Sequence, residues 1–370
     1  MTNIFRSTIA GGALSLAILL GMPGDAAHAQ ALVKTRLLLP VTNIDEAYSP
    51  YVVAKEVGFF RDEGLEVDIV PISGGTQATI QVAAGNGDFS PISPVNLIVG
   101  IQPSIGMRVQ LFHAIYYQNI WSISVMPESP IKSLAELKGK KVGVASMGSS
   151  GVLYGTAYLA RAGIQVGKDG TTFLPIGVGS QGATALRGGN VDGVVYWDAM
   201  LAKLDLAGLK LRQLPVDEAV RTLPDDGLGA TPETLEKRPQ VAVGFARAVA
   251  KGYEFTQANR DAAVRIVWKN FPESKARNVP DDEALKSALT VNQVCMAIWN
   301  SPKTGGKQGL FFKDDYERLI SFAKEFGLIP QDAQTTPEQL YTNKFNDQIN
   351  QFDRAAVRKL AAEFDVSKLR

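Results

Sequence analysis

The residues best able to hold a small molecule are polar side chains in Gly-rich turns. The turn Ser146-Met147-Gly148-Ser149-Ser150-Gly151 joins a predicted strand to a predicted helix. Free backbone N–H groups and the helix dipole at such a junction can bind an anionic group. Ser146, Ser149 and Ser150 are therefore candidate ligand contacts. A serine at this position also commonly caps the helix, so both interpretations stay open for Ser149 and Ser150.

Two further turns lie in segments that match one another. PISGGTQATIQVAAGNGD, residues 71–88, aligns without a gap with PIGVGSQGATALRGGNVD, residues 175–192, at Pro, Ile, Gly, Gln, Gly, Asn and Asp. The turns predict ligand contacts at Gly75, Thr76 and Gln181. Their glycines are expected to adopt positive φ. Asp88 and Asp192, the matched acids, are expected to tie the turn from helix to strand.

Residues 177–182 also fit the glycine pattern of dinucleotide-binding folds, with Asp198 downstream. That pattern belongs after the first strand of a nucleotide-binding unit, whereas here it falls midway through the second of two units. The matching segment, residues 71–88, lacks the pattern. We therefore expect no dinucleotide and no other cofactor.

Side chains that follow the other predicted strands are candidates for the same site: Asn43, Asp45, Tyr48, Ser93, Trp121, Trp197 and Asp198. A stacking ring and a carboxylate at Trp197-Asp198 would suit a polar aromatic solute. The alternative for Trp197 is packing on a crossing segment, and the alternative for Asp45 is a solvated acidic loop. For Glu46 the solvated loop is the favoured interpretation.

These candidates disagree about the charge of the ligand. Helix N-termini and serines favour a sulfonate, carboxylate or nitrate group. Asp45, Glu46 and Asp198 would repel such a group by several kcal/mol at a few ångströms, and no Lys or Arg is expected at the rim. A planar neutral or amine-bearing solute such as a pyrimidine is therefore favoured, with an anionic solute as the alternative.

The inventory of reactive side chains disfavours a metal or catalytic centre. Beyond residues 1–29 the chain has one histidine, His113, and one cysteine, Cys295, each inside an apolar run. A His-rich metal site or a disulfide cannot be built from them, and a Ser-His-Asp triad would depend entirely on His113. Lys plus Arg number 38 against 37 Asp plus Glu, so no net charge attracts nucleic acid.

Alternating strands and helices must position these turns. The hydrophobic pattern predicts strand, helix, strand, helix, strand over residues 34–93, and the same order over residues 140–197. This alternation is typical of a parallel sheet whose strand-end loops form a ligand crevice. We expect an α/β fold of two similar lobes with mostly parallel sheets, joined by two hinge crossings near residues 123–125 and 223–228.

The predicted domains follow from these crossings. Lobe I covers residues 30–123 and 228–370, and lobe II covers residues 124–227. Residues 1–29 hold a short apolar run and the triplet Ala27-His28-Ala29, which predict a cleaved signal peptide and export without a lipid anchor. The C-terminal part of lobe I is predicted to add helices that pack on the first lobe, at residues 281–299, 313–326 and 354–368.

A further helix is predicted to begin at Thr231 and Pro232 and to run to residue 259, because a threonine cap followed by proline is a strong start signal. The loop at residues 301–309 breaks the helical region. No role can be assigned to it from the sequence.

Five segments, in this order and spacing, resemble the exported solute-binding components of ABC importers for nitrate, alkanesulfonates, taurine and thiamine-pyrimidine precursors: KEVGFFRDEGLEVDIVPISGG, GNGDFSPIS, KSLAELKGKKVGVASMGSS, GGNVDGVVYWD and ETLEKRPQVAVGFARAVAKG. The resemblance covers residues 35–260, and the longer C-terminal third departs from it. It implies a type II periplasmic-binding fold that closes over a solute.

The resemblance also implies a monomer in the periplasm that delivers its solute to an ABC permease in the inner membrane, without catalysis, metal or nucleic acid. Two alternatives stay open. One is an enzyme of the thiamine-pyrimidine-synthase type, and the other is a periplasmic sensor whose closure informs a receptor.

Overall fold

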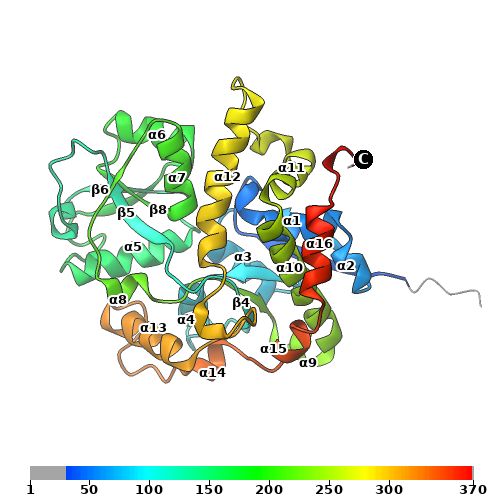
Figure 1. The fold of residues 1–370 in the computed structure, drawn as a ribbon. Coiled ribbons are helices and arrows are strands. Elements are labelled where there is room, and N and C mark those ends of the chain that lie inside the picture. The colour runs from blue at the N-terminus through cyan, green and yellow to red at the C-terminus, as the bar shows by residue number, and fades with distance from the viewer. Residues whose placement is uncertain (1–30, 369–370) are drawn as a thin grey trace, which may run out of the picture. The chain divides into compact units, whose positions relative to one another are not determined.

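The computed structural model describes residues 31–368, and Figure 1 shows the order of its elements. The predicted signal peptide, residues 1–29, lies outside this range. Within residues 31–368, no helix combines the length and the apolar character needed to cross a membrane.

The first strand and helix units form where the hydrophobic pattern predicts them. β1 (Val33–Leu39) lies parallel to β2 (Leu65–Pro71), and Leu37, Leu38 and Leu39 are buried under the helices. The helical segment between these strands is divided at Gly58, whose φ of 98° belongs to the left-handed region. The helices of this part are η1 (Glu46–Tyr48), α1 (Ser49–Glu56), α2 (Phe59–Asp62), α3 (Gly75–Ala83) and α4 (Pro94–Gly100).

A second sheet lies next to β1 and has the order β3-β10-β4. Its strands are antiparallel: β3 (Ser90–Ile92), β10 (Gly227–Ala230) and β4 (Gln110–Ala114). A parallel bridge between Leu37 and Phe89 connects β1 to the segment that enters β3. The third predicted strand of the first unit therefore takes its expected place beside β1.

The second unit forms a five-stranded sheet with the order β7-β6-β8-β5-β9. β6 pairs in parallel with β7 and β8, as the strand and helix alternation predicts, whereas β5 pairs antiparallel with β8 and β9. The strands are β5 (Trp121–Val125), β6 (Lys141–Val144), β7 (Thr172–Pro175), β8 (Gly193–Trp197) and β9 (Arg212–Gln213). The helices are η2 (Leu134–Leu137), α5 (Ser150–Arg161), α6 (Ser180–Arg187), α7 (Asp198–Leu206) and α8 (Glu218–Arg221).

The repeat in the sequence is also a repeat in the structure. Pro71 ends β2 and Pro175 ends β7. Oδ2 of Asp88 accepts a hydrogen bond from the backbone N–H of Arg36 at 2.8 Å, and Oδ2 of Asp192 accepts one from the backbone N–H of Lys141 at 2.9 Å. Each acid thus fastens its turn to the neighbouring parallel strand, which confirms the structural role predicted for this matched pair.

The chain passes between the two groups of strands twice. Residues 115–120 lead from β4 to β5, and residues 214–226 lead from β9 back to β10. The segment expected to cross at residues 123–125 lies inside β5, and the one expected at residues 223–228 ends inside β10. Each passage therefore leads into a strand that pairs antiparallel with its neighbours. The first passage leads into β5, and the second leads into β10.

Helices form most of the C-terminal third. The cap at Thr231 is confirmed, since its Oγ1 accepts from the N–H of Thr234 at 3.1 Å. The helix is interrupted at Arg238, because Pro239 disfavours the helical conformation of the residue before it. The helices are α9 (Pro232–Lys237), α10 (Pro239–Ala258), α11 (Arg260–Asn270), η3 (Pro272–Ser274), α12 (Asp281–Ile298), η4 (Pro302–Thr304), α13 (Lys313–Glu325), α14 (Pro337–Leu340), α15 (Asn346–Ile349), α16 (Arg354–Ala362) and η5 (Val366–Lys368).

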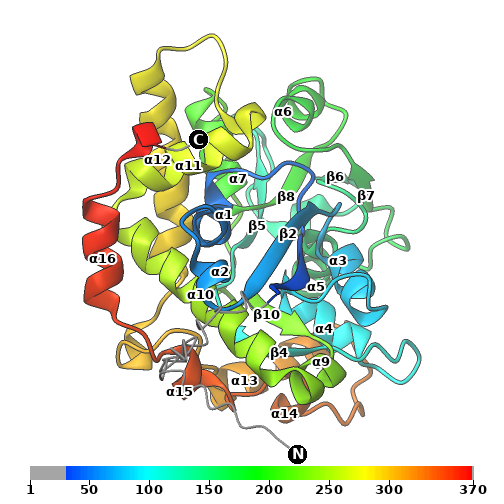
Figure 2. The ribbon, with the colours of Figure 1, turned by 90° about the vertical axis from the view of Figure 1, so that its right-hand side faces the viewer.

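The C-terminal helices pack on the first group of strands, with one exception. Figure 2 shows α16 lying along α10, and α10 packs on α1. The ring of Phe245 in α10 stacks on Phe60 at 5.0 Å and on Phe89 at 4.2 Å. α12 differs because it packs against η1 and also against α7 of the second unit. α12 therefore returns to the first lobe through η1, as predicted, and also makes a contact with the second unit that was not predicted.

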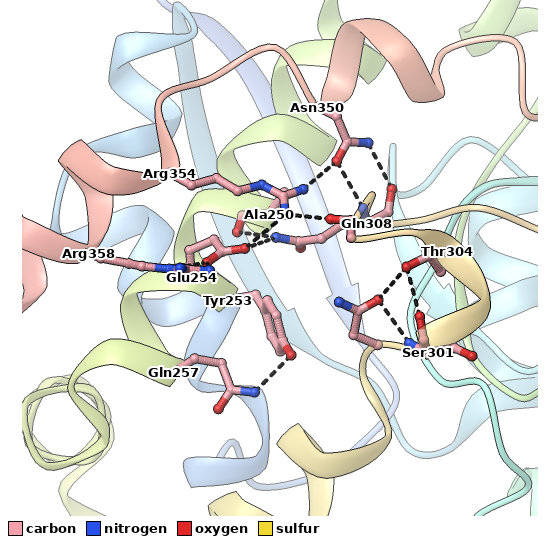
Figure 3. Close-up of polar contacts among 12 residues, drawn as sticks. Ala250, Tyr253, Glu254, Gln257, Ser301, Thr304, Gln308, Asn350, Arg354 and Arg358 are labelled. Atoms are coloured by element: carbon pink, nitrogen blue, oxygen red, sulfur yellow. Dashed lines mark hydrogen bonds and ion pairs between the residues drawn. The ribbon is translucent and has the colours of Figure 1, made fainter.

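The loop at residues 301–309 is fastened by buried polar contacts, drawn in Figure 3. Nε2 of Gln308 donates to Oε1 of Glu254 at 3.0 Å, and the backbone N–H of Gln308 donates to Oδ1 of Asn350 at 2.9 Å. Arg358 holds the other oxygen of Glu254 at 2.7 Å. Gln308 thus joins the loop to α10 and to the residue that ends α15.

Candidate functional site

A cavity of about 620 Å³ lies where the strand-end loops of both units meet. Loops after β1, β2 and β3 form one side of it, and loops after β6, β7 and β8 form the other. The carboxyl ends of the strands in an open α/β sheet are the usual place for a ligand crevice. α12 adds Val294, Cys295 and Ile298 to the lining.

Most of the candidate residues predicted from the sequence come together in this cavity. The residues that line it are Asn43, Asp45, Tyr48, Gly75, Ser93, Trp121, Ser146, Ser149, Ser150, Gln181, Trp197 and Asp198. Contact of each with a ligand stays a prediction.

Thr76 is placed differently from the other candidates. Its backbone N–H donates to the carbonyl oxygen of Gly148 at 3.0 Å, and its Oγ1 accepts from Nδ2 of Asn96 at 3.1 Å. Through the bond to Gly148, the backbone of Thr76 joins the turn after β2 to the turn after β6.

The glycines of the turn after β2 allow this close approach. Gly74 has a φ of 97°, and a Cβ at this position would collide with the carbonyl oxygen of Gly148. Gly75 does not have positive φ, so the expectation of positive φ is wrong for this residue. A Cβ on Gly75 would instead collide with Oγ of Ser150. Both glycines therefore permit two turns from different units to touch across the cavity.

The serines after β6 begin α5. The side chain of Ser149 accepts a hydrogen bond from the N–H of Gly151 at 3.2 Å, so the capping interpretation is confirmed for Ser149. Ser150 is the first residue of the helix and is buried beside Gly75.

A lysine that the sequence interpretation missed lies in the cavity wall. Nζ of Lys203 is 2.7 Å from Oδ2 of Asp45 and 3.3 Å from Oε1 of Glu46. The expectation that no cation reaches the rim is therefore wrong, and so is the picture of Glu46 as part of a solvated loop, because only 4% of Glu46 is exposed. Lys203 lies one helical turn beyond Ala199, which also lines the cavity, so helical periodicity from the end of β8 could have revealed it.

Burial and pairing act in opposite directions on these groups. Burial raises the pKa of Glu46, while the charge of Lys203 lowers it. Burial also lowers the pKa of Lys203, but the carboxylates of Asp45 and Glu46 more than compensate, so that pKa lies above its usual range. The three side chains therefore form one ion-pair cluster that spans the cavity.

Asp198 has a weaker cation partner. Oδ2 of Asp198 lies 4.0 Å from Nη2 of Arg221. Burial raises the pKa of Asp198, and the nearby charge of Arg221 lowers it.

Aromatic side chains form another part of the wall. The rings of Trp121 and Trp197 meet edge to face, with centroids 5.7 Å apart and an interplanar angle of 62°. Trp121 is 7% exposed and also stacks on Tyr154, whereas Trp197 is only partly buried. Trp197 is thus the more accessible of the two rings.

Two acids in the second passage were also missed. Asp226 lines the cavity, and burial raises its pKa to about 7. Asp225 lies beside it, 1% exposed, and accepts a hydrogen bond from Oγ of Ser93 at 2.5 Å. The available signal was a pair of carboxylates inside residues 223–228, whose other members are leucine, proline and glycine.

His113 and Cys295 are buried as predicted. His113 does not line the cavity, and burial lowers its pKa to about 4. Cys295 lines the cavity, and burial raises its pKa to about 12. Across residues 31–368, no three His, Cys, Asp or Glu side chains gather as metal ligands would.

Comparison with known proteins agrees with this architecture. The chain is 21% identical over 256 residues to a 4-amino-5-hydroxymethyl-2-methylpyrimidine phosphate synthase of Legionella pneumophila, which covers 66% of this chain and 77% of that protein. The alkanesulfonate-binding protein SsuA of Xanthomonas axonopodis superposes with a TM-score of 0.60 at 16% identity over 84% of this chain and 98% of its own. The nitrate-binding protein NrtA of Synechocystis superposes with a TM-score of 0.63 at 13% identity, over 90% and 99%.

These structures share a periplasmic-binding-protein fold with this chain, which confirms the predicted fold class. The NMT1/THI5 like family model matches residues 46–263, which include most of both repeated units and the first C-terminal helices. The chain therefore belongs to the NMT1/THI5 like family.

Proposed function

We propose that this protein is the solute-binding component of an ABC importer. It captures a small organic solute in the cavity and delivers it to a permease in the inner membrane. One observation carries this proposal: turns from two repeated α/β units line a single cavity and touch across it. The contacts are Thr76 N–H to Gly148 O at 3.0 Å and Lys203 Nζ to Asp45 Oδ2 at 2.7 Å.

Capture follows from the two passages between the sheets. Residues 115–120 and 214–226 act as hinges between lobe I, residues 30–114 and 227–370, and lobe II, residues 121–213, because boundaries at residues 123 and 228 would divide β5 and β10. A solute that contacts both lobes binds the closed arrangement more tightly than the open one, and this difference in affinity drives closure. The protein acts as a monomer in the periplasm after removal of residues 1–29.

The names of the structural relatives support this class of function. The SsuA structure is that of an alkanesulfonate-binding protein, and the NrtA structure is that of a nitrate-binding protein. Both fold over nearly their full length like this chain.

The named activity of the Legionella relative raises an enzyme as the second candidate. The described side chains that line the cavity include no histidine. Burial raises the pKa of the Cys295 thiol to about 12, so the thiol is protonated at neutral pH and is a poor nucleophile. We therefore favour binding over catalysis, and a sensor that uses the same closure is the third candidate.

Native extraction tests the proposal. Protein purified without denaturation should carry one solute per chain, which mass spectrometry identifies. The solute should return chemically unchanged after incubation, and removing it should increase the radius of gyration measured by X-ray scattering. A solute that is converted would favour the enzyme. Stimulation of ATP hydrolysis by a reconstituted permease would separate an importer from a sensor.

A further inference from the structure

Asp226 presents a carboxylate to the cavity without a cation partner. Its backbone carbonyl accepts hydrogen bonds from the N–H groups of Ile115 at 2.8 Å and Tyr116 at 2.9 Å, which fix the residue where the two passages meet. Among residues 31–368, the cavity acids Asp45 and Asp198 have Lys203 and Arg221 within 4.0 Å, but no such cation lies beside Asp226. Asp226 is half-buried, and a carboxylate that is partly removed from water and lacks a cation favours a ligand that supplies one.

The neighbouring residue Asp225 does not supply the missing positive charge. Asp225 uses one carboxyl oxygen to accept from Ser93, and the backbone of Ile120, the side chain of Trp121 and the carboxyl of Asp226 lie close enough to act on the same carboxyl group. Burial raises the pKa of Asp225 well above its usual range, and the charge of Asp226 raises it further. Asp225 therefore supplies no positive charge, and its own ionisation is disfavoured beside Asp226.

The walls near this carboxylate are aromatic. Tyr48, Tyr116, Trp121 and Trp197 all line the cavity. Flat rings stack on such walls, and a cation attached to the ring is attracted by the electron-rich aromatic faces.

The cations elsewhere in the wall are already engaged. Lys203 pairs with both Asp45 and Glu46, so two carboxylates share its single positive charge and would repel an anionic solute placed beside it. The same solute would also face the uncompensated charge of Asp226.

We propose that Asp226 selects the ligand, and that the solute is an aromatic or heteroaromatic ring carrying a protonated amine or an amidine-type pair of N–H donors. This inference rests on the proposed solute-binding function. An amidine-type pair matches the two oxygens of a carboxylate, as a guanidinium does.

Three small probes of similar shape test the inference on the full mature chain freed of its solute. They are benzamidinium, which is cationic, benzamide, which is neutral, and benzenesulfonate, which is anionic. Calorimetry should show benzamidinium binding at least tenfold more tightly than benzamide. Asp226→Asn should weaken benzamidinium at least tenfold and change benzamide less than twofold.

Matched variants separate recognition from folding. Asp205→Asn makes the same chemical change on the exposed part of α7 and should leave all affinities unchanged. Asp226→Glu keeps the charge and should restore part of the benzamidinium affinity. Melting temperatures of the variants show whether each is folded at the temperature of the titration.

Proton release gives a second measurement. Burial places the pKa of Asp226 at about 7, so binding of benzamidinium should release a proton near pH 7 and strengthen from pH 6 to pH 8. The titratable groups that face Asp226 are Asp225, Tyr48, Tyr51, Tyr116 and Tyr154. Burial raises the pKa of all four tyrosines, and Asp226→Asn separates the titration of Asp226 from that of Asp225.

Tighter binding of benzenesulfonate than of benzamidinium would overturn the inference. So would an unchanged benzamidinium affinity in Asp226→Asn, or no binding of benzamidinium to the wild type. In each of these cases a solute recovered intact from natively purified protein would still support the proposed function. Absence of any bound or binding solute would remove both.

Discussion

The ammonium group of Lys203 lies 2.7 Å from Oδ2 of Asp45, so a helix that follows β8 is paired with the loop that follows β1. Oε1 of Glu46 lies 3.3 Å from the same nitrogen. The two units of the repeat are thus connected by charge on one side of the cavity and by the glycine turns on another.

Lys203→Met should lower the free energy of unfolding by about 2 kcal/mol at pH 7.5. Removing one partner of a buried pair costs about 3–5 kcal/mol, and the smaller figure allows for partial exposure of Lys203. Burial raises the pKa of Glu46, and loss of the lysine should raise it further. A carboxylate with a raised pKa destabilises the fold as pH rises, so the loss should be smaller at pH 5. Urea unfolding at both pH values measures this.

The matched control is Lys210→Met, which removes a charge from an exposed position after α7. It should leave the unfolding free energy unchanged. Equal effects of the two substitutions would show that the ion pair contributes nothing to stability.

Gly74→Ala should weaken binding of the natively purified solute at least tenfold. The added methyl group would collide with the carbonyl oxygen of Gly148 and hold the two turns apart. Gly85→Ala is the matched control. The φ of Gly85 is 76°, similar to the 97° of Gly74, but no atom lies within 4 Å of the methyl group that the substitution adds. Calorimetry should find Gly85→Ala within twofold of wild type, and a similar loss in both variants would point to backbone strain instead.

Trp197→Ala should also weaken binding of that solute at least tenfold, while its melting temperature stays close to that of wild type. Trp197 lines the cavity and is only partly buried, so its ring is available for stacking. Trp121 is less useful for this purpose, because truncating a ring that is 7% exposed should cost about 3–5 kcal/mol of stability. Unaltered affinity in Trp197→Ala would remove this ring from the site.

His113→Gln should reduce the dependence of stability on pH between pH 4.5 and pH 7. Burial lowers the pKa of His113 to about 4, whereas the pKa of a histidine in the unfolded chain is about 6.5. The unfolded chain therefore binds a proton in this window that the folded chain does not, so stability falls as pH falls. The wild type should lose about 2.4 kcal/mol more than the variant on acidification from pH 7 to pH 4.5. An equal change in the free energy of unfolding of the wild type and of His113→Gln between the two pH values, measured by urea unfolding, would contradict this.

Glu254→Ala should destabilise the protein by about 3 kcal/mol, because Arg354, Arg358 and Gln308 lose a partner in a buried site. Glu233→Ala is the matched control, since Glu233 pairs with Lys237 on the exposed surface and its loss should not be measurable. Thermal unfolding of the two variants gives the comparison. Equal melting temperatures would mean that the polar contacts around the loop at residues 301–309 do not stabilise it.

The repeated strands and helices could be predicted because their signals are local. Apolar alternation places β2 and β7, the matched prolines end these strands, and the matched acids fasten the turns that lead into β3 and β8. The strand-end rule then gathers most candidate residues at one cavity without any knowledge of distances.

The residues that the sequence interpretation missed have only weak local signals, because their approach to the cavity depends on tertiary placement. Lys203 reaches the cavity only because α7 runs away from the end of β8 at the angle that brings its second turn to Asp45. Cys295 faces the cavity because α12 crosses to α7, although its sequence shows only a buried amphipathic helix. Asp226 lies inside the crossing segment predicted at residues 223–228, whereas in the structure it immediately precedes β10.

The placement of α12 has a mechanical consequence. This helix is in contact with η1 on one side and with α7 on the other, so the two units cannot separate while both contacts persist. The proposed hinge motion would therefore have to slide α12 along one of these two surfaces. On that proposal, the strength of this helix contact would limit how widely the entrance opens.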